Sequence, residues 1–74
     1  MYLQRLADLR EDKDLLKKEV AGVLGISRRV YSRYERGLQS MPLLYLIKLA
    51  DFYHTSADYI LGRTNDPTFY EKKR

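Results

Sequence analysis

The sequence predicts an all-α fold. Apolar residues along the 74-residue chain recur at intervals of three and four, which is the period of a helix rather than of a strand. The alternating β-branched runs and Asn-Gly turns that mark hairpins do not appear. Glycine, serine and proline residues lie between the apolar segments, at positions where helices are expected to begin and end. For so short a chain, these observations predict one domain with a single small core.

The first two predicted helices cover residues 2–12 and 16–24. The first has an apolar face made of Leu3, Leu6, Ala7 and Leu9. The second places Val20, Ala21 and Leu24 inward. Gly25 follows, and glycine is the residue best able to adopt the left-handed conformation that ends a helix.

Three further helices and a tail are predicted after Gly25. The third covers residues 28–36, with Ser27 as its N-cap and Gly37 after its end. Pro42 suits the first turn of a fourth helix, whose predicted inward residues are Leu43, Leu46, Ile47, Leu49 and Ala50. Ser56 can cap a short fifth helix that runs through Leu61, before Gly62. The domain is therefore predicted to span residues 1–62, and residues 63–74 to form a partly disordered tail.

The net charge of the chain is concentrated between Lys17 and Arg36. This segment holds six basic and two acidic residues, a net charge of +4, which equals the formal charge of the whole chain. Duplex DNA carries about one negative charge per 1.7 Å, so it favours a local positive field through phosphate contacts and counterion release. The charge pattern indicates a nucleic-acid partner.

The predicted third helix has a polar, basic face and an apolar face. At about 100° per residue, Val30, Tyr31 and Tyr34 lie opposite the arginines. Such a helix fits the major groove, where arginine can bond guanine bidentately and serine can donate or accept. The expected base-contacting residues are Arg28, Arg29, Ser32 and Arg33. The expected phosphate-contacting residues are Lys17, at the start of the second helix, together with Ser27, Arg36 and Ser40.

These residues resemble the Cro/C1-type (XRE-type) family of helix-turn-helix repressors. The resemblance covers about residues 5–62 and includes the segment EVAGVLGISRRVYSRYERG. Ala21 stands where the two helices of the motif cross, Gly25 stands at the turn, and Ile26 and Tyr34 stand at apolar positions that seat the third helix. The resemblance implies a compact five-helix, lambda-repressor-like domain whose second and third helices form the helix-turn-helix. It also implies that Arg10 pairs with Glu35 as a structural bridge.

Three positions depart from the family pattern. Lys17 stands where many relatives have a glutamine that bonds a phosphate and supports a base-reading residue, and we expect the lysine to keep only the phosphate role. Tyr31 occupies a buried position that is more often Ile or Val, so its hydroxyl must reach a partner or the surface edge. The loop of residues 38–41 lacks the basic residues that relatives often place against the DNA backbone, which predicts a modest affinity.

Two functional hypotheses follow. The first is a sequence-specific, double-stranded-DNA-binding transcriptional regulator, a repressor, that binds an operator as a homodimer with half-sites one helical turn apart. Its expected dimer interface is the fifth helix with Phe69 or Tyr70. The alternative is a protein-interaction module, such as an antitoxin or an adaptor with a helix-turn-helix core, for which the tail would contact the partner. The protein is expected to be cytoplasmic and encoded by a bacterium or a phage, and to associate with the nucleoid when it is bound to DNA.

The composition argues against other classes of protein. The chain has no cysteine, and its one histidine, His54, has no second candidate ligand near it, so we expect no metal site and no cofactor. No nucleophile paired with histidine, no carboxylate pair and no glycine-rich phosphate loop can be placed, so we expect no enzyme and no small-molecule ligand. No apolar run approaches the roughly 18 residues of a membrane span, and the N-terminus lacks the pattern of a signal peptide. We therefore expect no membrane association.

Overall fold

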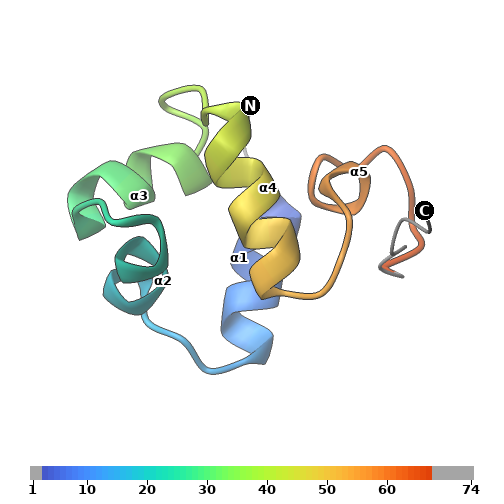
Figure 1. Ribbon diagram of the computed structural model, residues 1–74, viewed down its shortest axis with the longest axis horizontal. Coiled ribbons are helices and arrows are strands. Elements are labelled where there is room, and N and C mark those ends of the chain that lie inside the picture. The colour runs from blue at the N-terminus through green and yellow to red at the C-terminus, as the bar shows by residue number, and fades with distance from the viewer. Residues whose placement is uncertain (1–2, 68–74) are drawn as a thin grey trace, which may run out of the picture.

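Five helices follow one another in the computed structural model, which describes residues 3–67. They are α1 (Gln4–Asp12), α2 (Lys17–Leu24), α3 (Arg28–Glu35), α4 (Leu43–Phe52) and α5 (Ala57–Ile60). These residues contain no strand, so the all-α prediction is confirmed. In Figure 1, α4 crosses the front of the molecule with α1 behind it, while α2 and α3 lie on one side and α5 lies on the other. Within the described part of the chain, no helix has the length and apolar character needed to cross a membrane.

The helix limits lie within one or two residues of the predicted ones. α1 begins at Gln4, and the predicted start at residue 2 lies outside the described residues. α3 and α5 each end one residue earlier than predicted, because Arg36 and Leu61 form their C-caps. Pro42 is the N-cap of α4 rather than a residue of its first turn. Shifts of this size are usual at helix ends.

A turn of three residues joins α2 to α3. Gly25 adopts a left-handed conformation with φ of 72°, which would cost an L-residue about 1–2 kcal/mol. The amide of Ile26 then donates to the carbonyl of Ala21 at 3.0 Å. Ser27 begins α3, because its hydroxyl accepts from the amide of Val30 at 3.2 Å. The glycine and the serine cap therefore set the short connection that fixes α3 relative to α2.

One core joins all five helices. Each helix contributes a side chain that is no more than 2% exposed, and these are Leu6, Val20, Tyr31, Leu49 and Ile60. Val20, Ala21 and Leu24 of α2 are buried, as predicted from their spacing. Among the described residues, Tyr31 has the largest fully buried side chain. The core places α3 so that one of its faces is covered and the other faces solvent.

The prediction that Leu43 and Ile47 face inward is wrong. Their exposed fractions are 68% and 44%, and that of Leu44 is 73%. α4 packs against the core through Leu46, Leu49 and Ala50. Around the helix axis, Leu43 lies about 60° from Leu46, at the edge of the covered face. Ile47 lies about 100° from Leu46, beyond that edge. The apolar period located the helix but could not tell how wide a face its neighbours cover.

The residues after α5 lie against the helices. The guanidinium of Arg5 donates to the carbonyls of Tyr59, at 3.1 Å, and of Thr64, and it lies 4.4 Å from the centroid of the Tyr59 ring. The hydroxyl of Thr55 donates to the carbonyl of Pro67 at 2.8 Å. The start of the predicted tail is thus hydrogen-bonded to the domain. The predicted boundary at residue 62 stays a prediction, and residues 68–74 lie outside the described residues.

Candidate nucleic-acid interface

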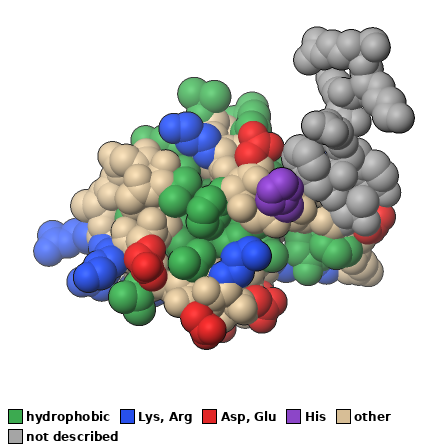
Figure 2. Space-filling model, turned by 60° about the horizontal axis from the view of Figure 1, so that its bottom comes forward, with side chains coloured by type: hydrophobic (Ala, Val, Ile, Leu, Met, Phe, Trp, Pro, Cys, Tyr) green, Lys and Arg blue, Asp and Glu red, His purple; other side chains and the backbone are tan. Residues whose placement is uncertain are grey.

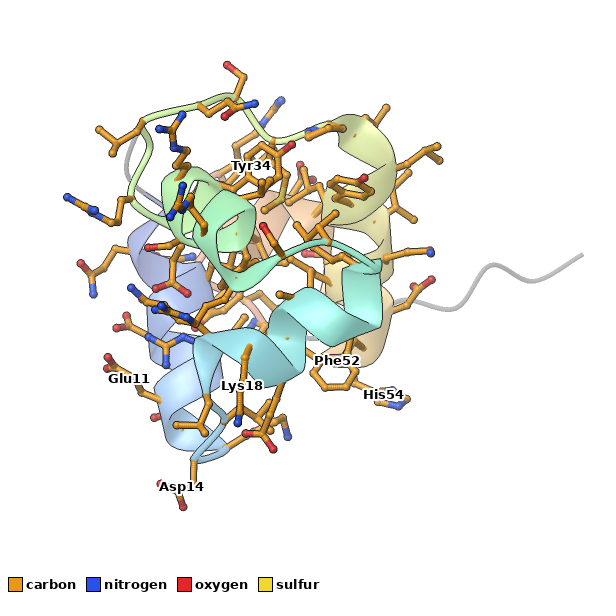
Figure 3. The ribbon with its side chains drawn as sticks, turned by 90° about the vertical axis from the view of Figure 1, so that its left-hand side faces the viewer. Glu11, Asp14, Lys18, Tyr34, Phe52 and His54 are labelled. Atoms are coloured by element: carbon orange, nitrogen blue, oxygen red, sulfur yellow. The ribbon has the colours of Figure 1, made fainter. Side chains whose placement is uncertain are left out.

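The two faces of α3 differ as the sequence predicts. Arg28, Arg29 and Arg33 are exposed, whereas Tyr31 and Tyr34 are buried. The ring of Tyr34 points toward α4 (Figure 3), and its centroid lies 6.0 Å from the ring centroid of Tyr45 on that helix. The aromatic contacts hold one face of α3 on the core. Three guanidinium groups are therefore presented to solvent by a helix that is fixed from behind.

Basic side chains gather at the end of the molecule that α2 and α3 form. Figure 2 shows Lys and Arg side chains projecting at this end. Figure 3 looks directly at this end, which is the left-hand side of Figure 1. Lys18 lies on α2 there, and Glu11 and Asp14 lie at the edge away from α3. The acidic end of α1 is thus kept away from the arginines of α3. This separation preserves the local positive field that a polyanion would meet.

A hydrogen bond links the start of α2 to the middle of α3. Lys17 is the first residue of α2, and its Nζ donates to Oγ of Ser32 at 3.3 Å. Both side chains are half-buried. The sequence predicted a phosphate contact for Lys17 and a base contact for Ser32, and the structure brings the two together. We expected Lys17 to contact phosphate alone and did not predict its hydrogen bond to Ser32. This hydrogen bond depends on how α2 and α3 cross, which the sequence pattern does not give.

A buried ion pair holds the other end of α3. Nε of Arg10 donates to Oε2 of Glu35 at 3.0 Å, and the side chains are 13% and 4% exposed. A second nitrogen of the same guanidinium donates to Oε1 at 3.3 Å, and the third to the carbonyl of Leu15 at 3.0 Å. The hydrogen bond to Glu35 raises the pKa of Arg10 above its usual value. The predicted Arg10–Glu35 bridge is confirmed, and it joins α1, the following loop and α3.

Two tyrosines surround this ion pair. The hydroxyl of Tyr31 donates to Oε2 of Glu35 at 2.8 Å, which supplies the partner that the sequence required for it. Burial, followed by the charge of Glu35, raises the pKa of Tyr31 well above its usual value. The same two causes raise the pKa of Tyr53 to about 12. The Tyr53 hydroxyl is buried and has no hydrogen-bond partner among the described residues.

The free energy of unfolding is expected to fall as the pH rises above about 10. An unfolded tyrosine titrates near pH 10, whereas the folded pKa values of Tyr31 and Tyr53 are raised. The unfolded state therefore loses protons first, and each tyrosine lowers the stability by up to about 1.4 kcal/mol per pH unit. The contribution is fully present below the unfolded pKa and is lost as the pH rises through the folded pKa.

Urea unfolding between about pH 9 and pH 12 measures this slope. Tyr31→Phe and Tyr53→Phe should each make it shallower. Tyr45→Phe, in a half-buried tyrosine of α4, is the control and should leave it unchanged. An equal slope in all four proteins would contradict the assignment to the buried pair.

The remaining predicted phosphate contacts lie at the two ends of α3 and in the loop before α4. Ser27 is exposed and uses its oxygen as the cap of α3, which leaves its hydroxyl proton available to donate. Arg36 is exposed at the C-cap of α3. Ser40 is exposed in a loop that also lines a pocket of about 210 Å³ with Leu3 and Tyr34. Their contacts with DNA stay predictions.

Among residues 3–67, no group of three or more His, Cys, Asp or Glu side chains is placed to hold a metal ion. The arrangement on α2 and α3 offers positive charge and hydrogen-bond donors. It suits binding of an anion that is extended along the surface.

Comparison with known proteins identifies the fold family. The family model described as "Helix-turn-helix" matches residues 6–60. An uncharacterized HTH-type transcriptional regulator of Bacillus subtilis, YobD, is 43% identical over 67 residues, which are 90% of this chain and 60% of the relative. The transcriptional regulator AnsR of the same organism is 40% identical over 63 residues, or 85% of this chain and 54% of the relative.

A third relative is a cryptic phage CTXphi transcriptional repressor, RstR, from Vibrio cholerae. It is 42% identical over 53 residues, which are 72% of this chain and 48% of the relative. The chain thus spans about half the length of these relatives. No solved structure matches it at a significant level. The family match over residues 6–60, together with the five helices and the capped turn between α2 and α3, shows that the chain belongs to the Cro/C1-type helix-turn-helix family.

Proposed function

We propose that this protein is a sequence-specific transcriptional regulator, a repressor, that binds double-stranded DNA with α3 in the major groove. The observation that carries the proposal is the exposed basic face of α3, whose opposite face is fixed on the core. The description of the relative RstR as a phage transcriptional repressor supports repression rather than activation. A protein with this function works in the cytoplasm, on the DNA of a bacterium or a phage.

The proposed contacts fall into two classes. The base-reading residues are Arg28, Arg29, Ser32 and Arg33, because an α-helix in the major groove presents such side chains to base edges. The phosphate contacts are Lys17, Ser27, Arg36 and Ser40, which lie at the ends of the helices and in the loop before α4. The first class supplies sequence preference, and the second supplies affinity and orientation.

We further propose that the protein binds as a homodimer. Two copies on half-sites one helical turn apart, about 34–36 Å between centres, gain the affinity that one short helix lacks. The expected interface includes α5 with Phe69 or Tyr70, and both of these residues lie outside the described part of the chain. The mass of the protein in solution, alone and with DNA, tests the stoichiometry.

Selection from a random pool of duplex DNA at near-physiological salt tests the function. We expect enrichment of an inverted repeat, whose spacing reports the dimer geometry. A single ungapped half-site would support DNA reading and contradict the dimer. No enrichment would contradict the proposal and would favour the protein-interaction module, an antitoxin or adaptor, which partner capture then examines.

Arg36→Ala is expected to weaken binding to every duplex by a similar factor. The plot of log K against log salt concentration has a negative slope. Removal of one phosphate contact should make that slope shallower by about one unit. Binding titrations of one selected and one unrelated duplex over a range of salt measure both effects. Arg63→Ala, an exposed arginine beyond α5, is the control. A change in base preference at one position would instead make Arg36 a base-reading residue.

A further inference from the structure

A half-buried arginine of α1 holds the chain that follows α5. The guanidinium of Arg5 donates to two carbonyls, that of Tyr59 at 3.1 Å and that of Thr64. A second nitrogen of the same group donates to the side-chain oxygen of Asn65. The guanidinium also lies 4.4 Å from the centroid of the Tyr59 ring, whose face attracts a cation. One side chain of α1 therefore joins the end of α5 to the residues beyond it.

The residues beyond α5 form a strap, residues 62–67, that is attached at a second point. Thr55 lies in the loop between α4 and α5 and is 2% exposed. Its hydroxyl donates to the carbonyl of Pro67 at 2.8 Å. The strap is thus held to α1 at its middle and to the loop before α5 at its end.

α5 is too short to hold its own position. It has four residues, and a single turn of helix is unfavourable because several residues are ordered for each hydrogen bond that is gained. Ser56 caps its start by accepting from the amide of Tyr59 at 3.0 Å. At its end, the carbonyl of Tyr59 accepts from the amide of Gly62 at 3.0 Å and from Arg5. The position of α5 therefore depends on hydrogen bonds from outside the helix, and Arg5 supplies the one from α1.

The strap and the helix-turn-helix are attached to α1 through different arginines. Arg10 pairs with Glu35 of α3, whereas Arg5 bonds to α5 and the strap. α5 lies on the opposite side of the molecule from α2 and α3 (Figure 1). Loss of the Arg5 contacts therefore leaves the Arg10–Glu35 pair and the turn between α2 and α3 in place. Domains commonly open locally in contiguous units of this kind.

We propose that Arg5 is a latch for the strap, and that α5 and the strap open and close as one unit while the helix-turn-helix stays folded. The closed form gives α5 a fixed surface, and the open form does not. A second copy that binds α5 therefore binds the closed form alone and stabilises it. This last step rests on the proposed homodimer, whereas the latch itself does not.

Amide hydrogen exchange in the full chain, followed by NMR at one protein concentration, tests the latch. The reporting amides are those of Leu61, Gly62 and Arg63, which donate to carbonyls within α5. The reference amides are those of Ile26, in the turn before α3, and Tyr31, in α3.

Three variants are compared with the wild-type protein: Arg5→Met, Thr55→Val and Arg63→Met. Thr55→Val keeps the shape of the buried side chain and removes only its hydroxyl. Arg63→Met is the matched control, since it removes an arginine of the strap itself, whose ion pair with Asp58 is exposed.

We expect Arg5→Met to speed exchange of the reporting amides by about 10- to 100-fold, because hydrogen bonds from a charged group to α5 and the strap are lost. The reference amides should change by less than about 3-fold. Thr55→Val should speed exchange of the reporting amides by about 3- to 10-fold, the usual effect of one neutral hydrogen bond. Arg63→Met should change them by less than about 3-fold.

Two kinds of result would overturn the latch. Equal acceleration of the reporting and reference amides in Arg5→Met, or loss of its helical far-UV circular dichroism, would mean that α5 and the strap open only with the whole domain. Reporting amides that exchange in Arg5→Met as they do in Arg63→Met would mean that Arg5 does not hold the strap.

Sedimentation equilibrium tests the coupling of the latch to a second copy. We expect Arg5→Met to weaken self-association by about 10-fold or more, because the form that binds is less populated. Binding to a duplex with a single half-site should stay as in the wild-type protein. Equal self-association of the two proteins would overturn the coupling. A wild-type protein that stays monomeric would instead refute the proposed homodimer, and the exchange measurement would then decide the latch alone.

Discussion

Replacing Arg10 by methionine is expected to lower the free energy of unfolding by about 3–5 kcal/mol. The substitution leaves Glu35, whose side chain is 4% exposed, as a buried carboxylate without its cationic partner. It also removes the hydrogen bond to the carbonyl of Leu15. Because small domains have about 5–15 kcal/mol of stability in total, this loss is a large part of what holds the fold together.

Urea denaturation of the wild-type protein and the variant measures the change through the transition midpoint. The control is Arg63→Met, because Arg63 lies 3.8 Å from Asp58 in an exposed ion pair and such pairs contribute little. Arg10→Met combined with Glu35→Leu should recover much of the stability, since no unpaired charge then remains buried. A cost below about 1 kcal/mol for Arg10→Met would mean that the pair behaves as a surface pair.

Arg10 and the arginines of α3 differ in the hydrogen-bond partners and the exposure of their guanidinium groups. All three nitrogens of the Arg10 guanidinium bond to Glu35 or to the Leu15 carbonyl. Arg28, Arg29 and Arg33 are exposed on the face of α3 that is turned away from the core. The ion pair thus fixes the helix, while the arginines on the opposite face of that helix stay exposed to solvent.

The helices and their order could be predicted because the signals for them are local. Gly25 ends α2 and Ser27 caps α3 through contacts that span three or four residues. The exposure of Leu43 and Ile47 could not be predicted, because it depends on which neighbouring helices cover α4. Period alone cannot distinguish a covered apolar residue from one at the edge of a covered face.

The candidate site likewise has features that could be predicted from the sequence and features that could not. The basic face of α3 follows from helical spacing, and the Arg10–Glu35 bridge was implied by the family resemblance. The contact of Lys17 with Ser32 and the position of Tyr53 near Glu35 join residues from different helices. Such contacts depend on how α2 packs against α3 and on where the end of α4 lies relative to Glu35, which no local pattern encodes.

Arg28→Ala and Arg29→Ala are each expected to weaken binding to the selected operator by about 1–3 kcal/mol, or roughly 5- to 150-fold. Each should relax the preference at one base pair, because a bidentate contact between arginine and guanine would be lost. Site selection with each variant identifies the position, and titration of the wild-type operator gives the magnitude. Lys13→Ala, an exposed residue just after α1, is the control and should leave both quantities unchanged.

Arg28→Lys and Arg29→Lys separate base reading from charge. Lysine keeps the positive charge, but its donors sit on one atom at the end of a flexible chain, so it holds O6 and N7 less rigidly than the planar guanidinium does. For a base-reading arginine, we expect the lysine variant to keep the salt dependence of binding and to lose part of the preference at its base pair. For an arginine that contacts phosphate, the lysine variant should bind every duplex nearly as the wild-type protein does. The second result at both positions would contradict direct reading by the start of α3 and would leave Ser32 and Arg33 to supply the specificity.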